Sequence, residues 1–96
     1  MAGEQQGTIF IALIEIPPAI EAKIRGKYPS LTGAEVKEAL QWPAKTDRRW
    51  EDHPVHGLRV IAHGATSSGR RILAAVHPVD AHDGHWRLRT ARAEGN

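Results

Sequence analysis

Two segments near the C-terminus predict neighbouring strands of one sheet: Ile72-Leu73-Ala74-Ala75-Val76 and, a short loop later, Trp86-Arg87-Leu88-Arg89-Thr90-Ala91-Arg92. The first segment is continuously apolar and predicts a buried strand. The second predicts a strand of period two, with Trp86, Leu88 and Thr90 on one face and Arg87, Arg89 and Ala91 on the other. Two arginines on one face would lie roughly 6.5 to 7 Å apart, close to the spacing of successive phosphates in a nucleic acid. Guanidinium groups bind phosphate bidentately, so RNA is the first ligand to test.

The residues before this stretch predict the partner strands of an antiparallel meander. Leu58 to His63 alternates as a strand, and the turn-forming run Gly64 to Gly69 joins it to the apolar strand as a hairpin. Arg48 to Glu51 predicts a short edge strand. His77-Pro78 is expected to end the apolar strand, and Asp83-Gly84 to turn the chain into the last one.

The first half of the chain predicts one strand and two short helices. Thr8 to Ile16 is β-branched and apolar on both faces, which indicates a buried strand. A helix is expected from Pro18, with Ile20 and Ile24 on its buried side and Gly26 as its C-terminal cap. A second helix is expected to run from the capping box of Thr32 and Glu35 to about Trp42.

Together these elements predict one α+β domain over residues 1–96, with an ordered core at about 8–92. It has an N-terminal strand, two short helices packed on one sheet face, and an antiparallel meander of three to four strands.

Composition excludes several classes of site. The chain of 96 residues has no cysteine, which excludes disulfides, thiol nucleophiles and cysteine-rich zinc sites. Its one long apolar run contains Glu15 and is too short to span a membrane, so we expect a cytoplasmic protein with no membrane partner. Net charge is only +2, but residues 53–96 hold six arginines and three acids, while all four lysines precede them. Arginine without lysine favours specific anion contacts.

Histidines and aromatic residues supply the candidate proton carriers and base contacts. His63 and His77, at strand ends, can exchange protons near neutral pH, although either is also compatible with an ordinary strand-end histidine. Lys27 can bind phosphate, and Tyr28 can donate a proton, stack on a base or simply pack. Trp42 and Trp86 are expected to complete the core, and Trp50 to be exposed for contact with RNA or a partner.

The loop from His77 to His85 also contains imidazoles and carboxylates that suit zinc or nickel. Its spacing matches no compact ligand signature. We therefore expect a solvated loop, and neither a metal nor another cofactor.

The order of these segments resembles the BrnT toxins of the RelE/ParE-like superfamily. The matching pieces are the basic turn between two short helices (24–32), the helix 35–40, the strand 58–62, the Gly69-Arg70 turn and the terminal strand 87–92. The resemblance implies the toxin of a toxin–antitoxin pair: a ribonuclease that cleaves RNA without a metal, using the RNA's own 2′-hydroxyl, and that a cognate antitoxin protein blocks.

Carried over to this chain, the resemblance implies a set of site residues. The family-like basic residues are Arg59, Arg70, Arg87, Arg89 and Arg92; of these, Arg59, Arg87 and Arg89 would stabilise the transition state, and Arg70 and Arg92 would help bind RNA. From the residues themselves, His63 or His77 is the candidate proton carrier, and Lys27, Tyr28 and Trp50 are further candidate contacts for RNA. Two alternatives stay open on the same fold: a non-catalytic protein-interaction module, and an RNA-binding domain without cleavage.

Overall fold

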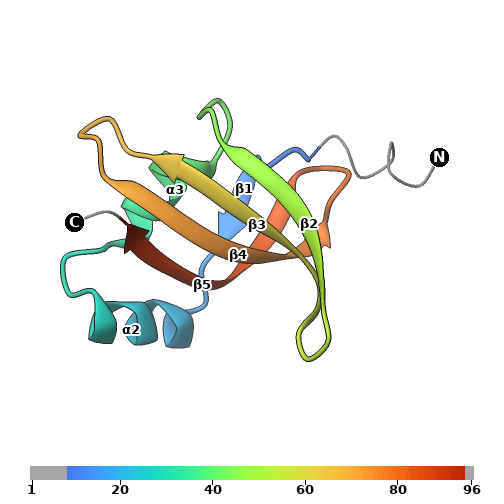
Figure 1. Ribbon diagram of the computed structural model, residues 1–96, viewed down its shortest axis with the longest axis horizontal. Helices are drawn as coiled ribbons and strands as arrows, with labels where there is room; N and C mark the ends of the chain where they lie inside the picture. Colours follow the sequence, from blue (N-terminus) through green and yellow to red (C-terminus); the bar gives the residue numbers. More distant parts are fainter. Residues whose placement is uncertain (1–8, 95–96) are drawn as a thin grey trace.

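A computed structural model describes residues 9–94 and confirms the α+β class, with two helices and one five-stranded sheet (Figure 1). Along the chain the elements are β1 (Leu13–Glu15), α2 (Pro18–Lys27), α3 (Gly33–Leu40), β2 (Asp47–His53), β3 (Gly57–Ala65), β4 (Arg71–Asp80) and β5 (His85–Glu94). The sheet order is β1-β5-β4-β3-β2, so the last four strands form the predicted antiparallel meander. β1 pairs with β5 in parallel and makes the sheet mixed.

The first strand is much shorter than the predicted segment from Thr8 to Ile16. Thr8 lies outside the described residues, and only Leu13–Glu15 pairs as a strand. The residues before it bond elsewhere: the carbonyl of Ile11 accepts from the N–H of Trp42 (2.6 Å), and the N–H groups of Ala12 and Leu13 donate to the carbonyl of Gly84 (2.8 and 3.0 Å). The segment therefore links the chain after α3 to the β4–β5 turn.

Bulges change which residues of the last two strands face the core. Ala75 pairs with Thr90 and Val76 with Leu88, which leaves Arg89 as an extra residue in β5. Thr90 is therefore exposed and Ala91 buried, so the predicted strict alternation is wrong beyond Leu88. β4 also continues past Pro78 to Asp80, against prediction, with a second register shift at the proline.

The sequence signals predicted where both helices begin, but the helices end at other residues than predicted. α2 begins at Pro18, but it runs through Gly26 to Lys27, and Tyr28 caps it. α3 begins at the predicted capping box, in which the Glu35 N–H donates to Thr32 Oγ1 and the Thr32 N–H to Glu35 Oε1, both at 3.1 Å. It ends at Leu40, two residues before the predicted stop at Trp42.

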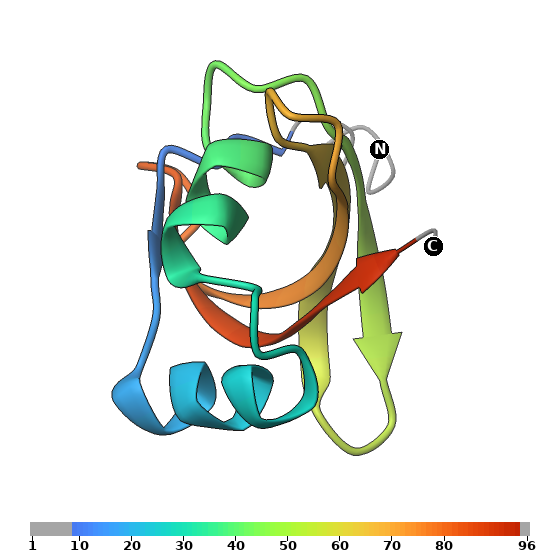
Figure 2. The same cartoon turned by 90° about the vertical axis from the view of Figure 1, so that its left-hand side faces the viewer.

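The sheet is strongly curved, and α3 lies on its concave side while α2 lies beside β5 (Figure 2). The core fills the concave side, where Val60, Ala62, Ile72, Val76 and Leu88 of the sheet meet Val36, Ala39 and Leu40 of α3. Trp86 is fully buried, as predicted, and its Nε1–H donates to the carbonyl of Phe10 at 2.7 Å. Among residues 9–94 no helix covers the opposite, convex face of the sheet. Among the described residues no helix is long and apolar enough to cross a membrane.

Candidate functional site

The convex face of the sheet carries most of the basic residues singled out in the sequence. Alternation in β3 and β4 sends Arg59, His63 and His77 outward, opposite their buried neighbours Val60, Ala62 and Val76. The bulge in β5 adds its own arginines to this side. The strand pairs there are Glu51 with Arg59, His77 with Arg87, and Leu73 with Arg92.

A cavity of about 380 Å³ brings together four predicted residues from three parts of the chain. Lys27 and Tyr28 come from the end of α2, which lies beside β5, while Arg59 comes from β3 and Arg92 from β5. Apolar and small side chains line the rest, including Ile61, Leu73, Ala75 and Thr90. We call this space the Arg59 cavity. Cations and a phenol around an apolar floor suit a ligand with both a phosphate and a flat base.

The Arg59 side chain is only 13 % exposed, which makes it the most enclosed of the arginines that form ion pairs within the described residues. Its Nε donates to Glu51 Oε1 at 2.7 Å, and this bond lowers the pKa of the Glu51 carboxyl. The carboxylate therefore stays ionised and fixes the guanidinium. Among the described residues Nη1 and Nη2 have no protein partner, which leaves two donors for a ligand.

The outer arginines are held more loosely. Arg87 reaches Glu15 through Nε (3.3 Å) and Nη2 (3.2 Å), and Arg92 lies 3.9 Å from Glu94. Their side chains are 53 % and 60 % exposed. Exposed pairs of this kind contribute little to stability. A phosphate can replace either carboxylate at small cost.

Two histidines that were not predicted as site residues lie close together: His53 is the last residue of β2, and His56 lies in the β2–β3 turn. His53 Nδ1 accepts from the N–H groups of Val55 (3.0 Å) and His56 (3.1 Å), and the two imidazoles lie 4.6 Å apart. Burial lowers the pKa of His56, and the positive charges of His53, Arg89, Arg59 and His77 lower it further. His56 is therefore neutral near pH 7 and able to accept a proton. The available signal was the His-Pro-Val-His run at 53–56, three residues before Arg59.

The predicted proton carriers separate in the structure. His77 follows Val76, and Arg59 precedes that residue's partner Val60, so these two residues lie across from each other just beyond the end of the β3–β4 ladder. His63 lies four residues from Arg59, about 13 Å along β3. Its Nε2 is 3.0 Å from Glu94 Oε1. His63 therefore sits away from the imidazoles near Arg59.

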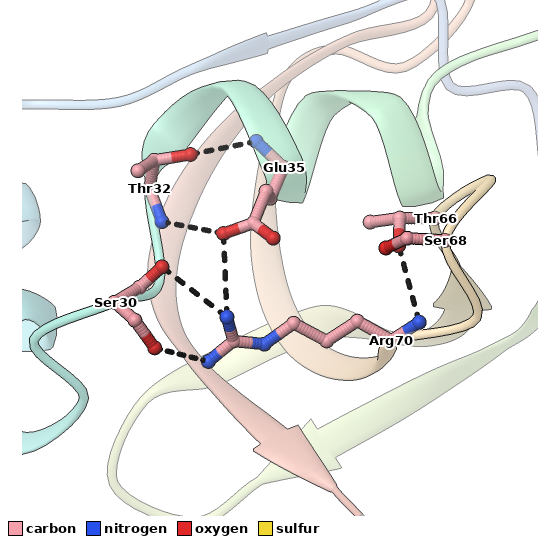
Figure 3. A network of polar contacts seen from close by, with 6 residues as sticks. All are labelled: Ser30, Thr32, Glu35, Thr66, Ser68 and Arg70. Carbon is pink, nitrogen blue, oxygen red and sulfur yellow. Dashed lines mark hydrogen bonds and ion pairs between the residues drawn. The ribbon is translucent and has the colours of Figure 1, made fainter.

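Arg70 has a structural role that the sequence did not indicate (Figure 3). From the β3–β4 turn its Nη1 donates to the carbonyl of Ser30 (3.2 Å) and lies 3.6 Å from Glu35 Oε1, and its Nη2 donates to Ser30 Oγ (3.1 Å). Its own N–H donates to Thr66 Oγ1. These contacts fix the hairpin turn to the start of α3, so the guanidinium predicted to bind RNA is already engaged by the fold.

Two tryptophan predictions are wrong. Trp50 pairs with Val60 across β2 and β3, on the core side, and its ring lies 5.5 Å from that of Trp86. It is therefore partly buried, on the face opposite the arginines, and not an exposed contact for RNA. Trp42, expected to complete the core, is 66 % exposed because α3 ends before it.

The segment from His77 to His85 is strand and turn. β4 extends to Asp80, whose Oδ1 accepts from the Asp83 N–H at 3.2 Å, and Gly84 has a φ of 76°. Within residues 9–94 no three histidine, aspartate or glutamate side chains come together as metal ligands.

The convex face thus offers guanidinium groups, a lysine and a phenol around one cavity, a set suited to binding a phosphodiester. The imidazole of His56 lies outside this lining, at the β2–β3 turn, and supplies a group that can move protons. Comparisons of the chain with models of protein families, with curated proteins and with solved structures gave no match.

Proposed function

We propose that this chain is a metal-independent endoribonuclease that binds single-stranded RNA on the convex face and cleaves it by attack of the 2′-hydroxyl. The observation that carries the proposal is the Arg59 cavity, in which Lys27, Tyr28, Arg59 and Arg92 line one space. His56 and His77 do not line this cavity, but the charge of Arg59 acts on His56. RNA is favoured over duplex DNA because unstacked bases can enter a cavity of this size and pack against Tyr28.

The arginines would hold and stabilise the phosphate. In the reaction a bond forms between the 2′-oxygen and phosphorus while the bond to the 5′-oxygen breaks, which leaves a 2′,3′-cyclic phosphate and a 5′-hydroxyl. Negative charge on the phosphate oxygens grows in the transition state. Arg59 is held rigidly by Glu51 and can direct its terminal nitrogens at this charge, and Arg89 adds a second cation.

Two imidazoles would carry the protons. His56 has a lowered pKa because of its burial and its cationic neighbours, so it would accept the proton of the 2′-hydroxyl. His77, beside Arg59, would protonate the leaving 5′-oxygen. Arginine cannot fill either role because it stays protonated.

The resemblance to BrnT toxins gives the proposal its biological context. The chain has a strand, two helices and a meander in sequence, and this element order supports the proposal of a RelE/BrnT-like arrangement. On this proposal the chain acts in the cytoplasm as a toxin, and its antitoxin covers the convex face. Expression of the chain alone would then arrest bacterial growth.

The test is cleavage of end-labelled single-stranded RNA by the purified chain in EDTA, with DNA of the same sequence alongside. We expect products that end in 2′,3′-cyclic phosphate, no cleavage of DNA, and a loss on the order of 100-fold or more in Arg59→Gln. Arg48→Gln is the matched control, because Arg48 is exposed and pairs with Ala62, on the opposite side of β2 and β3.

Intact RNA under these conditions would refute cleavage. RNA that binds in an Arg59-dependent way without being cut would instead support the RNA-binding domain. Absence of both would leave the protein-interaction module.

A further inference from the structure

The convex face holds a second basic cavity at its far end. It measures about 510 Å³ and lies between the start of β2 and the β3–β4 hairpin, where Lys45, Thr46, His63 and Arg71 line it. Lys45 and Arg71 have no ion pair or hydrogen bond among residues 9–94.

A third cavity of about 680 Å³ has lining residues in common with both. It shares Tyr28 with the Arg59 cavity, and Gly69 and Arg71 with the distal one. The three neighbouring cavities therefore mark a path from the end of α2 to the hairpin end of β3 and β4. Arg70 lines the middle cavity but is engaged by Ser30 and Glu35.

Charge along the path favours a polyanion. Six basic residues line it, against the two acids Asp47 and Glu94. The basic residues are Lys27, Arg59, Arg92, Arg70, Arg71 and Lys45. Glu94 is itself neutralised in part by His63 (3.0 Å) and Arg92 (3.9 Å).

The distance between the two end cavities is longer than one nucleotide. Arg59 and His63 mark the two ends on β3, about 13 Å apart. That is about two steps of the phosphate-like spacing between alternate residues of a strand. A mononucleotide in the Arg59 cavity cannot reach Lys45, whereas an extended strand of several nucleotides can.

We propose that Lys45 and Arg71 form a second phosphate-binding site, which holds the same single RNA strand two or more nucleotides away from the bond that is cut. This inference rests on the proposed function, since it places substrate in the Arg59 cavity. It assigns His63 to the distal contact, in place of a role in proton transfer. Its ligand is the backbone of single-stranded RNA, which is read without regard to base.

The test measures binding of 2′-O-methyl oligonucleotides, which cannot be cleaved, from a dinucleotide upward. Wild-type affinity should rise with length and then level off once the path is filled. Lys45→Gln/Arg71→Gln should bind the dinucleotide like wild type, lose about tenfold or more for the long strands, and show a salt dependence shallower by about 1.4 in log–log slope, as expected for two lost phosphate contacts.

Lys23→Gln/Arg48→Gln is the control, since it removes the same charge from exposed residues outside the path. Equal losses in both double variants, or no loss in the Lys45/Arg71 variant, would overturn the second site. If both double variants cleave an RNA dinucleotide at the wild-type rate, the proposed function stands whether or not the second site exists. Failure of wild type itself to cleave would count against the proposed function alone, because the length dependence is measured by binding.

Discussion

At the scale of single residues, His56 illustrates how the fold changes side-chain chemistry. The turn between β2 and β3 partly buries its imidazole, which lies within the electrostatic reach of the guanidinium groups of Arg89 and Arg59 and of the imidazoles of His53 and His77. Burial and these neighbours both oppose its protonation. No local pattern could reveal this, because Arg89 and His77 reach His56 only through the meander. The sequence did identify Arg59 and His77.

His56 makes stability depend on pH in a definite direction. Its pKa in the folded state lies below the ordinary value of about 6.5, so as pH falls through 6.5 the unfolded chain binds a proton that the folded chain resists. The free energy of unfolding should therefore decline on this side of pH 6.5. Chemical denaturation of wild type and His56→Asn checks it: the decline should be smaller in the variant. Identical profiles would show that His56 does not titrate as stated.

Arg70 shows the opposite case, a candidate ligand residue that the fold has engaged. Its guanidinium joins the β3–β4 turn to Ser30 and to the capping box of α3 (Figure 3). With its side chain 27 % exposed, Arg70→Gln should cost about 1 kcal/mol, or a melting temperature about 4 to 8 °C lower. Thermal melts followed by circular dichroism measure this, with Arg48→Gln as control. Weakened binding of RNA at an unchanged melting temperature would contradict the structural role.

At the scale of elements, the sequence predicted those whose cause is local. The capping box of Thr32 and Glu35 starts α3 where it was expected, and the alternation in β3 gives the observed faces. Strand limits depended on distant partners. β1 is short because Gly84 and Trp42 bond the residues before it, and the faces of β5 exchange at Arg89 because β4 is one residue shorter there.

Two glycines test how closely the elements pack. An added Cβ at Gly64 in β3 would meet the carbonyl oxygen of Ala39 in α3 and, at 3.0 Å, Cγ2 of Thr46, whereas one at Gly26 in α2 meets nothing within 4 Å. Gly64→Ala should therefore destabilise the fold by about 1 to 3 kcal/mol, and Gly26→Ala should stabilise it by about 0.5 to 1 kcal/mol. Urea denaturation measures both. Equal tolerance of the two substitutions would mean that α3 does not press against β3 as described.

At the scale of the whole molecule, the site depends on curvature and topology. β1 pairs only with the first part of β5, so the rest of β5 is an edge strand, and the end of α2 reaches the convex face past this edge. There Lys27 and Tyr28 line the same cavity as Arg59, which lies on β3, two strands away from β5. Because these residues are far apart in the sequence, no local pattern indicates that they line one cavity. Each of these residues could be predicted singly from the sequence. Only the folded sheet shows that they line one cavity and that Trp50 lies on the other face.

If the proposed function is right, RNA occupies the convex face around Arg59. Titration of isotope-labelled protein with an uncleavable 2′-O-methyl RNA strand, followed through amide NMR shifts, locates the bound strand. We expect the largest shifts at Tyr28, His56, Arg59 and Thr90, and none at Trp42 beyond the end of α3. Shifts confined to α3 and Trp42, or no shifts at all, would contradict the proposed function.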